Sequence, residues 1–598
     1  MVVLRDFLLF DEVASYYERL EGISSRLEMI DLFSELLGKS GKEEIKQLVY
    51  ITQGRLGPAF EPVETGIAEK FAIAAVAMAT GHDEAEVTRR YRKSGDMGLA
   101  AQELVGSTKL RRMADKKESI TEVYEMMRKI AETSGKGSQE TKIKLFASLI
   151  ASSGPTGAKY VTRLALGQLR LGLGDATILE ALSKMATGER KMKQQLESAY
   201  NICSDLGKVA DVLSRHGMRG IEKMGVELFS PIRPALAERL PTASDILERM
   251  GGRCAVESKY DGMRAQVHFS RKSKKVKIFS RNLEVVTEMF PEIAAAALDE
   301  IDAGEAIFEG EAISYDEVSG EFHPFQETAT RKRKHGIDEK SKEMPLHLFA
   351  FDLLYYEGES YLSKNYEERR RKLNSIMKKN GLIRPSDMIV TTSPKELEKY
   401  FTEAISEGLE GIVAKDLNAP YIAGARKFSW IKMKRSYKSE LSDSIDLVIV
   451  GYYLGRGQRA EFGFGGLLAA AYNEKRDMFE TITRIGTGFT EEQMKTFKRL
   501  LDKIKTGKKP ARVDSLVEPN FWVEPKYVVT VNADEITRSP MHTCGRTKNE
   551  DGEEIGYALR FPRIISEGVR EDKSAEDATT TKEIIEMFKL QKKTKLSD

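Results

Sequence analysis

A lysine at position 259 lies in the sequence ESKYDGMR, residues 257–264, which fits the pattern K-x-D-G-x-R. A lysine amine attacks an electrophile only when it is deprotonated, so its usual pKa of about 10.4 must be lowered by burial, nearby cations or a metal ion. Taken alone the pattern is weak, because Asp-Gly is common in solvated turns. Covalent chemistry at Lys259 is therefore predicted only if further groups accompany it.

Six polar clusters follow Lys259, and two of them place a glutamate beside a glycine. They are Ser280-Arg281-Asn282, Phe308-Glu309-Gly310-Glu311, Phe351-Asp352, EGIVAK at 410–415, WIKMK at 430–434 and RFPR at 560–563. Carboxylates such as Glu311 and Glu410 can hold Mg²⁺ beside phosphate oxygens, although either one alone could be a surface salt bridge. Together with the lysine they indicate phosphoryl or nucleotidyl transfer.

The elements that must position these clusters form a mixed α/β or α+β region. Residues 265–269, 276–280, 347–355, 411–414 and 428–433 have the composition of strands, and 366–379 and 394–407 that of helices. The Pro-Ile-Arg-Pro sequence at 231–234 predicts a linker in front of this region, because proline disfavours helix before it. We place the end of the region near residue 438.

The first 230 residues have helical periodicity throughout, with a capping box expected from Ser119 and Glu122. In the segment 160–175, arginines alternate with apolar residues, and its glycines permit a tight turn at which backbone amides could meet phosphates. A helix that ends at a glycine is the alternative interpretation.

After residue 442 strands dominate, at 445–453, 465–472, 479–485, 527–535 and 558–561, with one helix at 491–504. Short strands in this number fit a small barrel of the oligonucleotide-binding (OB) kind, and a sandwich fragment would look similar. A final helix is expected at 582–589, opened by a capping box from Thr580 and Glu583.

Composition bounds the class of protein and its partners. The 598 residues are 41% hydrophobic and 31% charged, without an apolar run of the roughly 20 residues that a membrane span needs. No secretory signal is evident, so we expect a protein of the cytoplasm, on the nucleoid in a prokaryote, with no membrane partner. Three scattered cysteines exclude a four-cysteine zinc site. The net charge of +2 does not by itself indicate nucleic acid.

The ordered clusters resemble those of the covalent nucleotidyltransferases. Over essentially its full length the chain resembles the ATP-dependent DNA ligases of archaeal and eukaryotic type. This resemblance implies a multidomain monomer with an all-α DNA-binding domain (1–230), an α+β adenylation domain (231–438) and a β-barrel OB-fold domain with a C-terminal helix (439–598). It also implies ATP and Mg²⁺ as cofactors and nicked double-stranded DNA as the partner, in replication, repair and recombination.

The resemblance further implies a role for individual residues. Lys259 would attack the α-phosphate of ATP and carry AMP, which then passes to the 5′-phosphate of the nick before the 3′-hydroxyl displaces it. The expected cofactor contacts are Glu257 at the adenine, Phe351 against the base, Arg264 and Arg281 near the ribose and the nick phosphate, Glu311 at the ribose or metal, Glu410 at the metal, and Arg426, Lys432 and Lys434 at the α-phosphate.

Outside the middle domain the resemblance assigns further cations to phosphate. Arg560 would orient pyrophosphate, Arg563 would hold DNA once the last domain swings away, and Arg163, Arg170 and, more weakly, Lys159 would contact the duplex without reading its sequence. The stretch 102–110 lacks the paired aromatic residues of a sliding-clamp peptide, so a clear clamp-binding site is not expected.

Other nucleotidyltransferases share the K-x-D-G lysine. RNA ligases and mRNA-capping guanylyltransferases usually begin close to it, whereas here about 230 residues precede it. An NAD-dependent DNA ligase would need the zinc site that three cysteines cannot build. A non-catalytic clamp of this architecture would be indicated by loss of Lys259, Glu311 or Glu410, and all three are present.

Overall fold

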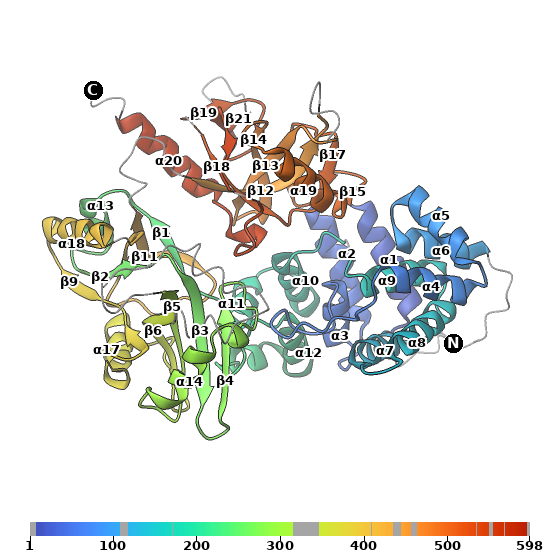
Figure 1. Cartoon of the computed structure of the whole chain (residues 1–598), viewed down its shortest axis with the longest axis horizontal. Helices are drawn as coiled ribbons and strands as arrows, with labels where there is room; N and C mark the ends of the chain where they lie inside the picture. Colours follow the sequence, from blue (N-terminus) through green and yellow to red (C-terminus); the bar gives the residue numbers. More distant parts are fainter. Residues whose placement is uncertain are drawn as a thin grey trace. The chain divides into compact units, whose positions relative to one another are not determined.

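The computed structural model describes residues 7–107, 118–169, 171–314, 346–378, 380–407, 409–434, 444–455, 463–533, 535–548, 554–566 and 568–594. The chain forms two compact units, one of residues Met1–Tyr200 and Ser204–Met224, the other of residues Asn201–Cys203 and Gly225–Asp598. Figure 1 shows helices in the first unit and sheets with flanking helices in the second. Among the described residues, no helix has the length and apolar character that crossing a membrane requires.

The first unit is helical, as predicted. Its helices are α1 Phe10–Gly22, α2 Arg26–Lys39, α3 Ile45–Thr52, α4 Glu69–Thr80, α5 Glu84–Ser94, α6 Met97–Ser107, α7 Ile120–Glu132, α8 Ser138–Ser152, α9 Pro155–Ala165, α10 Asp175–Thr187, α11 Lys193–Cys203 and α12 Leu206–Glu222. The last residues of α11, Asn201–Cys203, are grouped with the second unit. The predicted capping box of Ser119 and Glu122 opens α7. Helix α9 ends at Ala165, Gly167 follows with a φ of 63°, and α10 begins at Asp175, as a helix with a glycine stop would.

Two antiparallel sheets with flanking helices form the middle of the chain. One has the strand order β1-β11-β10-β2-β9 and the other β4-β3-β5-β6-β7, with β8 beside β6. The strands are β1 Leu236–Arg239, β2 Cys254–Lys259, β3 Met263–Ser270, β4 Lys275–Ser280, β5 Glu305–Ser314, β6 Leu346–Tyr356, β7 Glu359–Ser360, β8 Ile383–Pro385, β9 Met388–Thr391, β10 Gly411–Lys415 and β11 Arg426–Lys434. Among the described strands of these two sheets, only the pairs β1–β11 and β6–β8 are parallel.

Helices cover these sheets and complete their cores. They are α13 Ala243–Arg249, the 3₁₀ helix η1 Thr287–Met289, α14 Pro291–Asp299, α17 Tyr366–Ile376 and α18 Pro394–Ser406. Ile293 of α14 and Leu373 of α17 are buried in the core of the β3–β6 sheet, whereas Leu397 of α18 is buried in that of the β2–β10–β11 sheet. Two separate cores therefore meet where β2 leads into β3.

The C-terminal part is rich in strands. One sheet has the order β15-β17-β12-β13-β14-β16 with β18 and β22 attached, and a second has the order β19-β21-β20. Its elements are β12 Ile445–Tyr453, β13 Gly466–Asn473, β14 Met478–Ile485, α19 Glu491–Asp502, β15 Lys505–Thr506, β16 Val513–Asp514, β17 Phe521–Val523, β18 Val528–Asn532, β19 Glu535–Ser539, β20 Thr547–Lys548, β21 Glu554–Arg560, β22 Arg563–Ile564, the 3₁₀ helix η5 Ala575–Asp577 and α20 Thr581–Thr594. Phe497 of α19 and Ile584 of α20 lie in one apolar cluster with residues of β12, β13 and β14.

Most predicted elements are confirmed, with shifts of a few residues at their ends. The strand predicted at 527–535 is confirmed by β18, but its predicted end is wrong, because β18 ends at Asn532 and β19 begins a different sheet at Glu535. Both segments are rich in β-formers, and composition does not reveal a change of sheet between them. Arg170 and part of the 102–110 stretch lie outside the described residues.

Candidate active site

Lys259 lies at the end of β2, in a row that crosses three strands. It pairs with Gly411 of β10, and Gly411 pairs with Lys434 of β11. Neighbouring strands are about 5 Å apart, so the two lysines flank β10 at the same level. The backbone N–H of Glu410 donates to the carbonyl of Lys259 at 3.0 Å, which places the Glu410 side chain between them.

The Glu410 carboxylate contacts both lysines. One oxygen forms an ion pair with the Lys259 Nζ and the other with the Lys434 Nζ. Burial disfavours the charge on Glu410, but the two ammonium groups outweigh it and hold the pKa of Glu410 well below its usual range. The Lys259 side chain is 25% exposed, so solvent and ligands can reach it.

Two motif glycines permit this arrangement. A Cβ added to Gly411 would lie 2.1 Å from the carbonyl oxygen of Met433 in β11. At Gly262 it would lie 2.5 Å from the carbonyl oxygen of Ala312 in β5. Any side chain at either position would push the strands apart, and with them Lys259, Glu410 and Lys434.

Arg264 lies in β3, the strand that follows β2 in sequence and belongs to the second sheet, where it pairs with Glu311 of β5. Its guanidinium donates to Glu309 Oε2 at 2.7 Å and to the carbonyl of Ala235 at 2.9 Å. Tyr421 also donates to Glu309, at 2.7 Å. Glu309, the first glutamate of FEGE, received no role from the sequence, although it is 1% exposed and orients the arginine.

Glu311 is a half-buried carboxylate beside these cations. Burial raises the pKa of Glu311 to about 7, and Lys259 and Arg264 act in the opposite direction. Burial also raises the pKa of Asp261, and Glu410 adds to this effect. Carboxylates that resist ionisation in the absence of a cation are suited to bind one.

The acidic residues fit a shared metal ion rather than a closed metal centre. Among the described residues, no group of three or more His, Cys, Asp or Glu side chains is placed to hold an ion. Mg²⁺ commonly takes one or two carboxylates and completes its shell with water and substrate phosphates. Glu311 and Glu410 meet that requirement only together with a phosphate ligand.

A second group of contacts surrounds Glu257, two residues before Lys259 on the same side of β2. Its carboxylate accepts from Lys415 at 2.8 Å, from Arg370 at 3.1 Å and from the Tyr366 hydroxyl. Nearby, Phe351 packs edge-on against Trp430 with ring centroids 5.9 Å apart. The adenine contacts expected of Glu257 and Phe351 therefore lie at one aromatic, buried end of the site.

Lys432 and Arg426 face α20 rather than the Lys259 row. Arg426 forms an ion pair with Glu583 of α20. Burial disfavours the charged form of Glu583, but Arg426 and Lys432 outweigh this effect and lower the pKa of Glu583 to about 2. Burial holds the pKa of Lys432 well below its usual range, against the attraction of Glu583. Of the three cations expected at the α-phosphate, the structure brings only Lys434 into contact with the Lys259–Glu410 pair.

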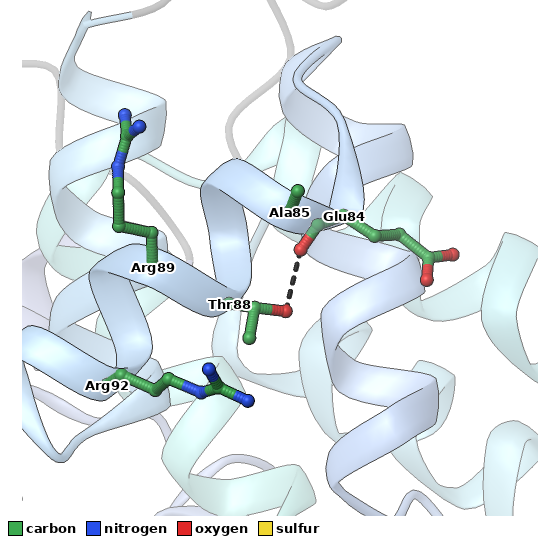
Figure 2. A pocket seen from close by; sticks show the side chains of 5 residues that line it. All are labelled: Glu84, Ala85, Thr88, Arg89 and Arg92. Carbon is green, nitrogen blue, oxygen red and sulfur yellow. Dashed lines mark hydrogen bonds between the residues drawn. The ribbon is translucent and has the colours of Figure 1, made fainter.

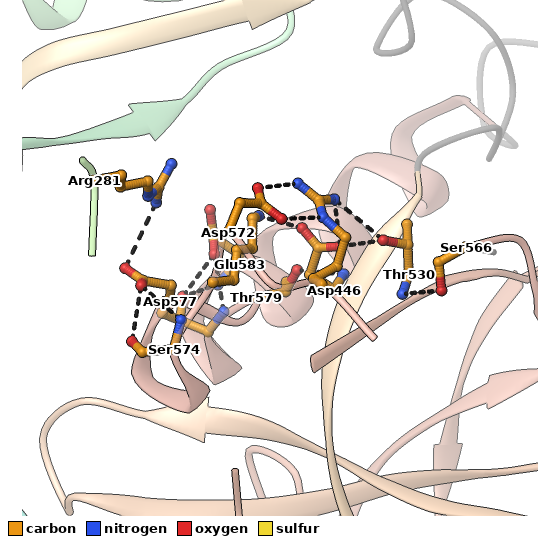
Figure 3. Close-up of polar contacts among 12 residues, drawn as sticks. Arg281, Asp446, Thr530, Ser566, Asp572, Ser574, Asp577, Thr579 and Glu583 are labelled. Carbon is orange, nitrogen blue, oxygen red and sulfur yellow. Dashed lines mark hydrogen bonds and ion pairs between the residues drawn. The ribbon is translucent and has the colours of Figure 1, made fainter. Parts of the chain in front are cut away.

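Arg281 follows β4 and points toward the C-terminal part, where Asp577 lies 3.6 Å from its guanidinium (Figure 3). The side chain of Asn282 donates to the carbonyl of Glu571 at 3.1 Å. Arg570 forms an ion pair with Asp572 at 2.6 Å and belongs to none of the sequence motifs. Glu410 is among the charges that raise the pKa of Arg570, after its hydrogen bond to Asp572. Arg570 is therefore a cation of the C-terminal part, absent from the sequence motifs, whose charge interacts with that of Glu410.

Family models match the chain in three places. The "DNA ligase N terminus" model matches residues 9–183, the "ATP dependent DNA ligase domain" model matches 234–434, and the "ATP dependent DNA ligase C terminal region" model matches 460–573. The chain belongs to the ATP-dependent DNA ligases. Its fold is therefore a multidomain ligase fold with a helical N-terminal domain, a nucleotidyltransferase domain and a C-terminal domain.

Curated relatives of this ligase share its whole length. A "Probable DNA ligase" of Dictyoglomus thermophilum is 48% identical over 591 residues, which are 99% of both chains. A "DNA ligase" of Sulfolobus acidocaldarius is 42% identical over 604 residues, covering 98% of this chain and 99% of the relative. The family resemblance predicted from the motifs is confirmed, and with it an ATP-dependent ligase that seals nicks.

The remaining predicted phosphate contacts have partners other than Lys259, Glu410 and Lys434 among the described residues. Arg560, at the end of β21, forms an ion pair with Glu535 at 2.9 Å and is 57% exposed. Arg563 lies in β22 with an exposed side chain. In α9, Arg163 is buried and pairs with Asp96 at 2.8 Å and with Glu21, and Lys159 pairs with Glu21 at 2.7 Å. For Arg163 to bind DNA, its guanidinium would have to leave two carboxylates.

A shallow hollow of 420 Å³ lies on α5 of the helical unit and contains no residue of the Lys259 row. Figure 2 shows that its lining comes from one helix: Glu84, Ala85, Thr88, Arg89 and Arg92. The Thr88 hydroxyl donates back to the carbonyl of Glu84 at 2.7 Å, so it is engaged locally. Its charged lining residues are Glu84, Arg89 and Arg92, and Arg89 forms an ion pair with Glu86 of the same helix.

Proposed function

We propose that this ligase works through a covalent lysine–AMP intermediate at Lys259. The contact of Lys259, Glu410 and Lys434 at the ends of three adjacent strands carries the proposal, because it joins a nucleophile, a carboxylate and a phosphate-binding cation. The neutral amine attacks the α-phosphorus of ATP, a P–N bond forms, and the bond to the β-phosphate oxygen breaks to release pyrophosphate. The amine proton leaves to solvent or a nearby base.

The adduct then reacts with nicked double-stranded DNA. An oxygen of the 5′-phosphate attacks the phosphorus of the adduct, and the P–N bond breaks to free Lys259. The 3′-hydroxyl next attacks the activated 5′-phosphate, forms the phosphodiester and releases AMP. We place this reaction in replication, repair and recombination, where nicks arise.

The cations around the row act on charge that develops on phosphate. Lys434 is placed to neutralise the α-phosphate, and Arg264, held by Glu309, is placed near Glu311, where the ribose is expected. Arg281 is the candidate for the nick phosphate. Mg²⁺ held through Glu311 and Glu410 would stabilise negative charge on the phosphates. Arg426 and Lys432 can contact the phosphates only if their interactions with Glu583 of α20 are broken.

The C-terminal domain would supply further phosphate contacts. We propose that it is an OB-fold, supported by the β12–β13–β14 meander with α19 and α20 packed on its core. Arg570 is a further candidate for pyrophosphate during adenylation, as a cation that Asp572 and Asp446 hold and that the charge of Glu410 also affects. Arg560 and Arg563, which are exposed, could take over at ATP or DNA after a domain movement.

The test is self-adenylation with ATP labelled at the α-phosphate, in the presence of Mg²⁺. The wild-type chain should become labelled, and Lys259→Ala should not. Lys427→Ala is the matched control, because Lys427 also lies in the β2–β10–β11 sheet but is exposed and outside the site. Labelling of Lys259→Ala at the wild-type level would contradict the proposal.

The acceptor and the nucleotide are tested separately. The labelled protein should transfer its AMP to a nicked DNA duplex and join it. Labelling from GTP instead of ATP would favour a capping enzyme, and transfer only to RNA ends would favour an RNA ligase.

A further inference from the structure

Three buried donors occupy most of the hydrogen-bond acceptor positions of the Glu257 carboxylate. Tyr366 and Arg370 donate to one oxygen, the arginine at 3.1 Å, and Lys415 donates to the other at 2.8 Å. All four residues are at most 4% exposed. A carboxylate has about four acceptor positions, so about one remains for a ligand.

Each donor is itself fixed in place. The Arg370 guanidinium also donates to the Ser386 hydroxyl at 2.8 Å and to the Ser386 carbonyl. The Lys415 ammonium also donates to the carbonyl of Phe351 at 2.9 Å, so it links Glu257 to the strand that carries the expected base-packing ring. Since the donors cannot turn, the plane of the Glu257 carboxylate cannot turn either.

Tyr366 and Arg370 reach Glu257 because they are four residues apart on α17. The side chain of Asn365 accepts from the Glu368 N–H and so sets the start of the helix at Tyr366. Burial, reinforced by the charge of Glu257, raises the pKa of Tyr366 well above its usual range, which keeps its hydroxyl a donor. The helix thus presents two donors to one carboxylate oxygen.

We propose that Tyr366, Arg370 and Lys415 are positioning residues for base selection: they hold the Glu257 carboxylate in one orientation with one acceptor position open. A purine with an amino group at position 6 can donate to that position. A purine with an oxygen there would set an acceptor against a carboxylate that cannot rotate away. The inference rests on the proposed adenylation of Lys259 and on the expected contact of Glu257 with adenine.

The alternative is that this network only stabilises the domain, and a neighbouring residue separates the two roles. Arg369 precedes Arg370 on α17, is equally buried and pairs with Asp352 at 2.7 Å, but has no contact with Glu257 among the described residues. Arg369→Met should therefore destabilise the domain about as much as Arg370→Met without freeing the Glu257 carboxylate.

The experiment compares ATP with inosine triphosphate, which carries oxygen in place of the 6-amino group. We measure kcat/KM for self-adenylation with each nucleotide in the wild type and in Tyr366→Phe, Arg370→Met, Arg370→Lys and Arg369→Met, and check folding by thermal unfolding. The ATP preference should fall about tenfold in Arg370→Met, the scale of one charge-assisted hydrogen bond, and a few-fold in Tyr366→Phe. Arg370→Lys should recover part of it, and Arg369→Met should keep the wild-type ratio.

An unchanged ratio in Arg370→Met and Tyr366→Phe would overturn the inference, as would an equal fall in Arg369→Met. The binding ratio of the two nucleotides to Lys259→Ala and to Lys259→Ala/Arg370→Met tests base selection without the covalent step. If the wild type forms no adduct but the binding ratio still depends on Arg370, the proposed function fails and the base selection stands.

Discussion

Two pairs of basic residues, one pair in each compact unit, have different surroundings. In the helical unit, Arg163 and Lys159 of α9 are buried and share Glu21, with Asp96 as a further partner of Arg163. In the second unit, Lys259 and Lys434 also share one carboxylate, but each side chain is 25% exposed at a strand end. An ion pair therefore does not reveal the role of a cation; access for a ligand separates the two cases.

The secondary structure explains this difference. A helix packs one face against its neighbours, and Gly98 of α6 approaches Arg163 so closely that an added Cβ would lie 2.7 Å from its Cγ. Lys259 and Lys434, by contrast, are the last residues of β2 and β11, and Glu410 is the residue before β10. The two lysine side chains are each 25% exposed, so a phosphate ligand can reach them.

The largest expected effect is on the helical side. Arg163→Met would leave Glu21 and Asp96 without their shared buried partner, which typically costs about 3–5 kcal/mol of the free energy of unfolding. Urea unfolding of the helical unit within the full chain measures it. Arg92→Met, on the exposed face of α5, is the control and should change stability by less than about 0.5 kcal/mol.

The two roles of Arg163 give different results. If Arg163 also binds DNA, Arg163→Met should lose affinity for nicked duplex as well as stability. That outcome would show that the buried pairs open on binding and would remove the contrast between the units.

Glu410→Gln tests the other side. The substitution removes the charge that Lys259 and Lys434 share, so both the geometry of the amine and the metal contact are weakened. We expect self-adenylation to slow by about 100-fold, the scale seen when one electrostatic contact of a transition state is removed. Glu407→Gln, an exposed residue near the end of α18, is the control. A rate within a few-fold of wild type would show that Glu410 has only a structural role.

The sequence motifs named Lys259, Glu410 and Lys434, and the structure brings their three side chains into contact, while their roles stay predictions. Glu309 was missed because FEGE contains two glutamates, and the sequence does not show which of them is buried. Tyr366 and Arg370 were missed because they reach Glu257 from a helix more than 100 residues later, and the periodicity of α17 shows only that it packs. The spacing around Arg163 likewise indicates a helix but not the carboxylates that face it.

The pH dependence of the free energy of unfolding provides a further comparison, through Glu311 in the Lys259 site. The pKa of Glu311 is raised to about 7, so the folded ligand-free protein holds a proton that the unfolded chain releases near pH 4.5. The stability that this proton provides is fully present below about pH 4.5 and is lost as the pH rises through 7. Allowing for partial exposure, we expect a loss of about 1–2 kcal/mol between pH 5 and pH 7.5.

Urea unfolding at the two pH values, in the wild type and in Glu311→Gln, measures that loss. The variant should lack this part of the pH slope, whereas Glu292→Gln, a carboxylate on α14 outside the site, should retain it. Mg²⁺ with ATP should reduce the slope in the wild type, because bound cation replaces the proton. Identical slopes in Glu311→Gln and the wild type would place the group responsible elsewhere.

The smallest expected effect concerns the exposed cations of the helical unit. Within the part of the chain that the structure describes, no partner contacts Arg92, and Arg89 pairs only with Glu86 on its own helix. If the helical unit holds DNA through phosphates, removing one arginine–phosphate interaction should reduce the slope of log affinity against log salt by about 0.9. Arg89→Gln/Arg92→Gln should therefore bind nicked duplex a few-fold more weakly at low salt with a flatter slope, and Arg371→Gln, exposed on α17, should not. An unchanged slope would move the DNA-binding face away from α5 and leave buried Arg163 as the better candidate.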